Sequence, residues 1–273
     1  MKTAQDLRPI LPEQLCTGVS AQRVALHFSK GVDSYEAEAG FHRKLVRELE
    51  KQVLELSLKP QNILEIGSHT GLLSRQIRTI FPLARLYCVD IQAEGHQKNI
   101  RDALTTFVQA NGEKLPFAPQ TFDLVVSGAT FQWFNGWLAS LLNIVDLIKP
   151  GGILAFSQFL KPSLEPLRSE AEKIGRASSF LKMMEHAKVL EDLKNCFPEV
   201  QGQFFEQVNH YPNLHSILKH LRAMGVGASL NTENKWTRLQ IKQWEEGIEA
   251  HRDSMGLPLR YGAGIYRIRR PLL

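Results

Sequence analysis

Apolar residues along the chain alternate between short runs typical of buried strands and longer stretches with helical spacing. Strands are predicted at 62–66, 86–90, 107–109, 122–127 and 153–156. Helices are predicted at 36–56, 72–80 and 138–148, because apolar residues there recur every three or four positions. This alternation indicates βαβ units that form a parallel sheet with helices on both faces. A ligand of such a sheet binds at the carboxyl ends of the strands.

The pattern becomes mainly helical after residue 159. Two more strands are predicted at 204–208 and 261–268, and helical spacing recurs between them at 214–224 and 239–251. An insertion of about fifty residues is longer than an ordinary loop. The sequence therefore predicts a doubly wound, Rossmann-like α/β fold with a seven-stranded sheet and a helical cap inserted between the last two strands. We expect this cap to lie over the strand ends, where a substrate would bind.

Composition is that of an ordinary globular protein, with 43% apolar and 22% charged residues. The N-terminus lacks the apolar core of a secretory signal, and no apolar run approaches the roughly 18 residues of a membrane span. A cytoplasmic protein without membrane association is expected. No metal site is expected, because three of the nine histidines are spaced by five and do not share a helical face: His210, His215 and His220. Three separated cysteines are expected to be reduced: Cys16, Cys88 and Cys196.

The formal net charge of +5 has two interpretations at this stage. A positive surface favours an acidic partner, such as nucleic acid, an anionic lipid surface or an acidic protein. Alternatively, a modest excess of positive charge only keeps the protein soluble. The one dense basic run, at 267–270, is too short for a nucleic-acid-binding tail.

A glycine-containing turn at 65–71 lies between a predicted strand and a predicted helix, which is the context of a nucleotide-type binding loop. Gly67 allows a tight turn and close approach of a ligand, and Gly71 allows close packing of the helix. Asp90 ends the next predicted strand, where a carboxylate can accept hydrogen bonds from both ribose hydroxyls. Glu65 in the turn would repel a pyrophosphate but suits the cationic amino acid end of S-adenosylmethionine. The sign of this charge therefore favours S-adenosylmethionine over a dinucleotide.

These residues resemble the class I methyltransferase family, whose first motif reads ExGxGxG and whose second strand ends in an acid. His69 replaces the middle glycine of that motif, so its side chain must point away from the cofactor or narrow the pocket. The segment 111–117 resembles the family's D-A-E-x-L-P-F segment, with Asn111 as a neutral acceptor for the adenine amino group. The resemblance implies that these residues bind S-adenosylmethionine: Tyr35, Glu65, Gly67, Gly71, Asp90, Ile91, Asn111, Gly112 and Ser127.

The segment after the fourth predicted strand restricts the class of methyl acceptor. Family members that methylate amino groups of bases or glutamine carry an N/D-P-P-Y/F/W tetrapeptide there, and this chain has an unrelated sequence at 127–134. Methylation of an exocyclic amine is therefore disfavoured, and no nucleic-acid partner is expected. Trp133 in this segment is either core packing or an aromatic wall beside the transferred methyl group.

Four further segments resemble the malonyl-acyl-carrier-protein O-methyltransferases of biotin synthesis. They are 24–29 together with Tyr35, where that family has a tyrosine that closes over the cofactor, 72–74, 218–225, and 256–261 with 266–270. The resemblance implies methyl transfer to the free carboxylate of malonyl-acyl carrier protein. The net positive charge would then attract an acidic carrier protein. Gln158 departs from this family, which usually has a small hydroxyl residue there.

A carboxylate acceptor needs no general base, because it is already ionised at neutral pH. An arginine is expected to bind its non-attacking oxygen, with Arg222 as the first candidate and Arg168 or Arg176 as weaker ones. Two alternatives stay open: an O-methyltransferase for a small-molecule carboxylate, and a methyltransferase-like binding module with weak or no catalysis. The expected parts are a helical segment that closes over the cofactor (1–60), the cofactor-binding core (61–210), the cap (211–257) and the final strand (258–273).

Overall fold

A computed structural model describes residues 19–226 and 236–272 of the chain. Its strands are β1 (Asn62–Ile66), β2 (Arg85–Asp90), β3 (Thr105–Gln109), β4 (Phe122–Gly128), β5 (Ile148–Leu160), β6 (Val200–Tyr211) and β7 (Leu257–Arg269). Its α-helices are α2 (Ala21–Gly31), α3 (Tyr35–Glu38), α4 (Gly40–Leu54), α5 (Leu72–Ile80), α6 (Trp137–Asp146), α7 (Leu167–Lys173), α8 (His186–Cys196), α9 (Leu214–Ala223) and α10 (Arg238–Glu249). Short 3₁₀ helices are η2 (Glu94–Gln97), η3 (Phe131–Trp133) and η4 (Ala177–Ser179).

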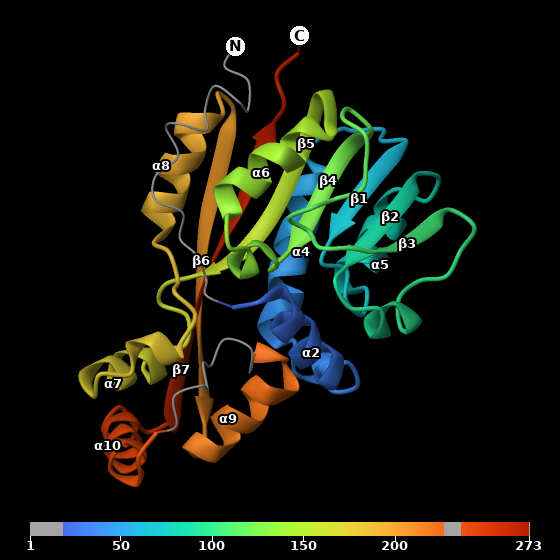
Figure 1. The fold of residues 1–273 in the computed structure, drawn as a ribbon. Coiled ribbons are helices and arrows are strands. Elements are labelled where there is room, and N and C mark those ends of the chain that lie inside the picture. Colours follow the sequence, from blue (N-terminus) through green and yellow to red (C-terminus); the bar gives the residue numbers. More distant parts are fainter. Residues whose placement is uncertain (1–18, 227–235, 273) are drawn as a thin grey trace.

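The strands form one seven-stranded sheet in the order β3-β2-β1-β4-β5-β7-β6 (Figure 1). The first five strands are parallel, and β7 runs antiparallel to both of its neighbours, β5 and β6. The chain order reverses between β1 and β4, which is the switch point at which a doubly wound sheet opens a crevice. The predicted doubly wound α/β fold is confirmed.

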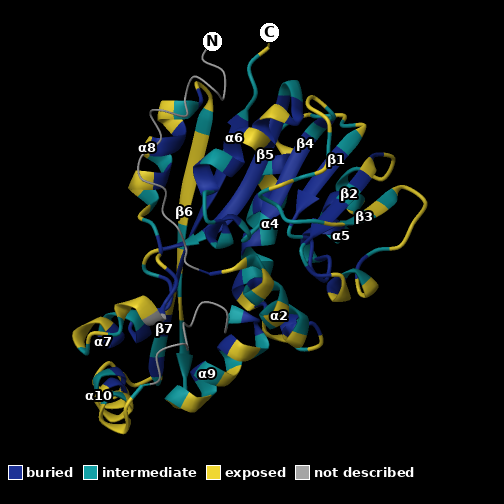
Figure 2. Ribbon diagram, in the orientation of Figure 1, coloured by how far each residue is buried: buried dark blue, intermediate teal, exposed yellow. Residues whose placement is uncertain are grey.

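Each face of the sheet is covered by helices, and the central strands are buried on both sides (Figure 2). Ile63 and Leu124 belong to the core formed with α4 and α5. The next residue of each strand, Leu64 and Val125, belongs to the core formed with α6 and α8. Because successive side chains of a strand point to opposite faces, a strand buried on both sides must be apolar throughout. This is why β1, β2 and β4 can be predicted from the sequence as continuous apolar runs.

Strands β6 and β7 are much longer than predicted. Their antiparallel pairing runs without interruption from Val200 opposite Ile268 to Tyr211 opposite Leu257. Most of β6 is exposed or only partly buried, because it is the edge strand, so polar residues interrupt its apolar pattern. The two strands continue beyond the sheet core toward α9 and α10 (Figure 1).

The insertion between β6 and β7 contains α9 and α10, where helical spacing is predicted. Helix α9 packs against α2 and α3 of the N-terminal part. Helix α10 packs against α7, and the indole N–H of Trp244 donates to the carbonyl of Leu167 at 2.9 Å. Helices from both ends of the chain therefore gather at one end of the sheet.

Two further predictions concern cysteines and membranes. Cys88 is buried and free, Cys196 is also free, and Cys16 lies outside the described residues. Within 19–226 and 236–272, no helix is long and apolar enough to cross a membrane.

Candidate active site

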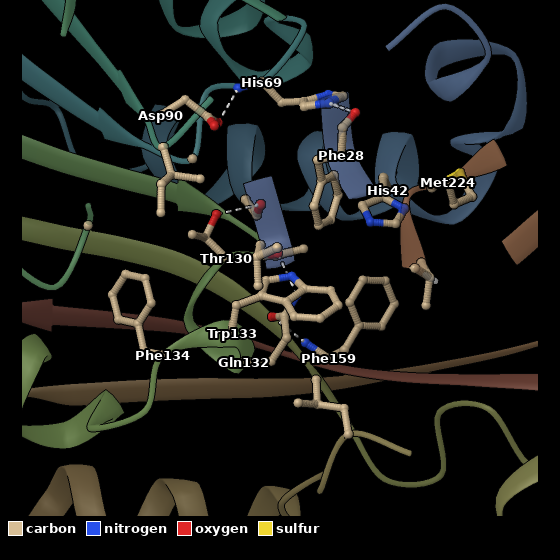
Figure 3. Close-up of a pocket in the computed structure, with 18 of the residues that line it drawn as sticks. Phe28, His42, His69, Asp90, Thr130, Gln132, Trp133, Phe134, Phe159 and Met224 are labelled. Carbon is tan, nitrogen blue, oxygen red and sulfur yellow. Dashed lines mark hydrogen bonds between the residues drawn. The ribbon is translucent and has the colours of Figure 1, made fainter. Parts of the chain in front are cut away.

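A pocket opens at the carboxyl ends of β1, β2 and β4, where the sheet order reverses (Figure 3). Gly67, Asp90 and Gly128 line it from these strand ends. Helices α2, α3, α4 and α9 line the opposite wall. A smaller pocket adjoins it, and the two share Tyr35, His42, Gly67, His69, Gly128 and Ala129. The pocket thus lies between the sheet and the helices gathered above it.

The glycine turn approaches the pocket only because Gly67 has no side chain. Gly67 has a φ of 78°, and a Cβ atom there would lie 2.0 Å from the Thr130 hydroxyl oxygen. The N–H of Gly67 donates to the carbonyl of Val89 at 2.8 Å, which fixes the turn against β2. Gly71 has a φ of 89°, but a Cβ there would meet Asn99 at 2.2 Å, and Gly71 does not line the pocket. Gly71 therefore serves close packing, whereas Gly67 serves the site.

Asp90 lies at the end of β2 and is buried, with its carboxylate at the pocket wall. One oxygen accepts the backbone N–H of His69 at 2.8 Å, and the other accepts that of Gln92 at 3.0 Å. A third backbone N–H, that of Ile91, also hydrogen-bonds to this carboxylate. A carboxylate has about four lone-pair positions, so room for a ligand donor remains. Burial raises the pKa of Asp90 to about 6, and the three N–H donors oppose this shift. The group is therefore mainly ionised at neutral pH and suits a hydroxyl donor.

The side chain of His69 lines the pocket and narrows it, which is one of the two orientations predicted for it. Its φ is 41°, the left-handed region that glycine adopts more easily. The imidazole lies 4.4 Å from the ring of Tyr35 and 5.5 Å from that of Phe28, measured between ring centroids. Burial lowers the pKa of His69 to about 4, so the ring is neutral. The side chain thus links the glycine turn to α2, where Nε2 of His69 lies 3.4 Å from the carbonyl oxygen of Phe28 (Figure 3).

Four residues line the part of the pocket predicted to hold adenine: Ile91, Asn111, Gly112 and Phe134. The side-chain oxygen of Asn111 accepts the N–H of Glu113 at 2.9 Å and keeps a further lone pair. A Cβ at Gly112 would lie 2.6 Å from Phe134, so the glycine allows this aromatic ring to approach. Phe134 was not predicted as a site residue. Its aromatic type, just after β4, was the available signal.

Two other predicted cofactor residues lie behind the pocket wall. Glu65 is buried, accepts a hydrogen bond from Ser74, and borders only the smaller pocket. Burial raises the pKa of Glu65 to about 8, so it is mainly neutral at pH 7 in this structure. The Ser127 hydroxyl donates to the carbonyl of Ile66 at 2.8 Å and lines neither pocket. Gln158 is fully buried in β5 and also lies outside both linings.

Aromatic and apolar side chains surround the other end of the pocket, which we call the acceptor end. They include Phe28, Phe41, Trp133, Phe159, Leu181, Met183, Leu221, Met224 and Tyr261. The rings of Trp133 and Phe28 meet edge to face at 5.5 Å. Trp133 therefore both packs against the N-terminal helix and lines the pocket, so its two predicted roles are compatible.

The arginines predicted to bind the acceptor do not line the pocket. Arg222 lies on the exposed side of α9, whereas its neighbours His220 and Leu221 face the pocket. Arg168 donates to the carbonyl of Leu181, and Arg176 donates to the side chain of Gln240. In fact no lysine or arginine lines the pocket within the described ranges. The arrangement gives no support to a direct contact between Arg222 and an acceptor inside the pocket.

Three polar side chains that are linked by hydrogen bonds line the acceptor end instead. Glu38 lies 2.7 Å from Nδ1 of His220, and Nε2 of His220 lies 2.9 Å from the hydroxyl of Tyr261. All three residues line the pocket. Sequence reasoning missed Glu38 and His220, although a signal existed. Ile217, Leu221 and Met224 form an apolar stripe on α9, and helical spacing places His220 on that face and Arg222 off it.

Comparison with known proteins shows which proteins this chain is similar to. Residues 64–156 match the family described as methyltransferase domain. The chain is also 28% identical to malonyl-[acyl-carrier protein] O-methyltransferase 2 of Ilyobacter polytropus, over 84% of this chain and 89% of that protein. The chain contains a methyltransferase domain. Its cofactor is S-adenosylmethionine, and its reaction class is that of the O-methyltransferases.

Solved structures share the fold of this methyltransferase. The [4+2]-cyclase SpnF superposes with a TM-score of 0.61 at 11% identity, over 96% of this chain and all of that one. Phosphoethanolamine N-methyltransferase 2 of Haemonchus contortus, in complex with S-adenosyl-L-methionine, superposes with a TM-score of 0.52 at 15% identity, over 89% of this chain and 57% of that one. Proteins with such different names share this fold, so the acceptor of the methyltransferase must be argued from its own pocket.

Proposed function

We propose that the enzyme methylates the free carboxylate of a malonyl group on an acidic acyl carrier protein, giving a methyl ester at the start of biotin synthesis. The observation that supports this most is the extent of the similarity to a relative of that name, which covers 84% of this chain. The methyltransferase domain alone spans only residues 64–156. The similarity therefore extends well beyond the residues that match the methyltransferase domain.

The residues of the pocket fit S-adenosylmethionine. Asp90 would accept hydrogen bonds from the ribose hydroxyls beside its backbone N–H donors. Ile91 and Phe134 would pack on the adenine, with Asn111 at its amino group. The amino acid end would lie where the two pockets meet, beside Gly67 and under Tyr35. Glu65 lies behind the turn at that end, where it accepts a hydrogen bond from Ser74.

Bound S-adenosylmethionine supplies an electrophilic methyl group on a sulfonium. The protein's part is to hold the acceptor carboxylate in line with that group and to keep water out. No side chain needs to remove a proton, because the carboxylate is already ionised. The aromatic wall formed by Phe28, Trp133 and Phe159 suits this task, since positioning alone contributes roughly 7–11 kcal/mol to such reactions.

A panel of acceptors with labelled S-adenosylmethionine tests the proposal. We expect label to pass to malonyl carrier protein and not to acetyl carrier protein, which lacks the free carboxylate. The product should lose its label in mild alkali, as a methyl ester does. Transfer to a small dicarboxylate in preference to the carrier protein would favour the small-molecule alternative. A product stable to alkali and esterase would contradict carboxyl methylation.

Salt dependence tests the carrier protein as partner. The net charge of +5 should speed association with an acidic carrier protein, and salt should screen this attraction, with a Debye length of about 10 Å at 0.1 M. We expect kcat/KM for malonyl carrier protein to fall steeply with ionic strength, and that for malonyl-coenzyme A to fall less. Parallel curves at saturating cofactor would mean that the net charge serves solubility only.

A further inference from the structure

His220 is held between a carboxylate and a phenol at the acceptor end. Helix α9 places it against Glu38 of α3, 2.7 Å from Nδ1, and against Tyr261 of β7, 2.9 Å from Nε2. Tyr211 of β6 packs beside it with ring centroids 5.4 Å apart, and His42 of α4 interacts with it electrostatically. Three segments far apart in the sequence are thus joined by two hydrogen bonds at one wall of the pocket.

These contacts restrict which atoms of Glu38, His220 and Tyr261 carry protons. The carboxylate of Glu38 can only accept, so Nδ1 of His220 carries a proton. The Tyr261 hydroxyl has a second partner, since it also hydrogen-bonds to Tyr211. When Nε2 of His220 donates to the Tyr261 oxygen, the single Tyr261 proton can go to Tyr211 or to a ligand in the pocket. A ligand that accepts from Tyr261 must therefore take this proton from Tyr211.

The other histidines of the pocket do not provide such a group. Burial lowers the pKa of His42 to about 3 and that of His69 to about 4, so both rings stay neutral at physiological pH. No lysine or arginine lines the pocket in the parts of the chain that the structure describes. Glu38 is 44% exposed at its side chain and lies directly against His220, so it stabilises a positive charge there.

We propose that Tyr261 and His220, backed by Glu38, form the subsite that binds the acceptor's carboxylate. The imidazolium donates through Nε2 to the Tyr261 oxygen, and the Tyr261 hydroxyl donates to the carboxylate oxygen that does not attack. The inference rests on the proposed function for the carboxylate class of acceptor. In this subsite, a charge-assisted hydrogen bond from Tyr261 takes the role predicted for an arginine. The negative charge of the attacking oxygen is not neutralised, so this oxygen stays nucleophilic.

The bound carboxylate requires a proton on both nitrogens of His220, at Nδ1 toward Glu38 and at Nε2 toward Tyr261. A histidine acting as a general base would have the opposite requirement, because it must be neutral at the start of the reaction. Loss of acceptor binding, rather than of turnover alone, therefore distinguishes this subsite from a general base.

Calorimetry without turnover tests the subsite. Malonyl-pantetheine is titrated into the protein saturated with S-adenosylhomocysteine. We expect Tyr261→Phe and His220→Gln each to weaken binding about tenfold or more, the effect of removing a hydrogen bond to a charged group. His215→Gln, on the exposed side of the same helix, is the matched control and should bind malonyl-pantetheine as the wild type does.

Acetyl-pantetheine separates the carboxylate from the rest of the ligand, and all variants should bind it alike. Unchanged malonyl-pantetheine binding in both His220→Gln and Tyr261→Phe would overturn the inference. So would a His220→Gln variant that binds the acceptor normally and loses only turnover. Failure of the wild type to methylate malonyl carrier protein would reject the proposed function instead, since the calorimetric readout needs no methyl transfer.

Discussion

Replacing Asp90 by alanine is expected to weaken S-adenosylmethionine binding about ten- to hundredfold. The ribose hydroxyls would lose a charged acceptor, a contact worth about 1.5–3 kcal/mol. The same carboxylate holds the backbone of His69 and Gln92, so the glycine turn would lose its anchor as well. Calorimetric titration of the cofactor measures the effect. Asp146→Ala, an exposed aspartate at the far end of α6, is the control and should bind normally.

The pH dependence of cofactor affinity identifies the carboxylate itself. Burial raises the pKa of Asp90 to about 6, and the ribose donors prefer the ionised form. Affinity should therefore be full at pH 7 and fall as the pH drops through 6 toward 5. Across this range His69 stays neutral and Glu65 stays protonated, with pKa values of about 4 and about 8. Asp90→Asn should remove this dependence, and an unchanged pH profile in that variant would contradict the assignment.

Gly67→Ala is expected to damage both stability and cofactor binding. A left-handed backbone costs a residue with a Cβ about 1–2 kcal/mol. The new methyl group would also lie 2.0 Å from the Thr130 hydroxyl oxygen, an overpacking that adds about 1–3 kcal/mol. Relief of this clash requires the turn to move away from the pocket. We expect a lower thermal unfolding midpoint and a cofactor affinity reduced by more than tenfold.

Gly175→Ala is the matched control for the backbone contribution. Gly175 has a φ of 72°, and a Cβ there would meet nothing within 4 Å. The Gly175→Ala variant should lose only the stability that a left-handed backbone costs a residue with a Cβ, and it should bind cofactor normally. Adding Thr130→Ala to Gly67→Ala should restore part of the lost stability, since it removes the nearest clashing atom. Equal losses in Gly67→Ala and Gly175→Ala would show that the contact with Thr130 is unimportant.

The strands and the turn of the cofactor-binding half could be predicted from local sequence. Strands buried on both faces give continuous apolar runs, and β1 has the predicted bounds, 62–66. The turn after β1 and the acid that ends β2 are fixed by backbone geometry within a few residues. That is why Gly67 and Asp90 could be placed in the pocket from sequence alone. Glu65 was harder, because its burial behind the turn depends on Ser74 and Cys88 from two other elements.

The acceptor half depends on contacts between distant segments, which the sequence does not encode locally. Glu38 and Tyr261 lie more than 200 residues apart, and only the packing of α9 against α3 and against the β6–β7 pair brings them to His220. The preference for Arg222 followed from charge chemistry and from the resemblance of segment 218–225 to the carrier-protein methyltransferases. The apolar stripe on α9 gives that preference no support, since Arg222 lies off the face that packs inward.

The central claim is that one pocket holds the cofactor at Asp90 and the acceptor carboxylate at Tyr261. The most direct test measures initial rates of methyl transfer to malonyl carrier protein while each substrate is varied in turn. We predict that Asp90→Ala raises the KM for S-adenosylmethionine and leaves that for the carrier protein nearly unchanged, whereas Tyr261→Phe does the reverse. A wild-type enzyme that forms no alkali-labile product, or two variants that raise the same KM, would contradict the account.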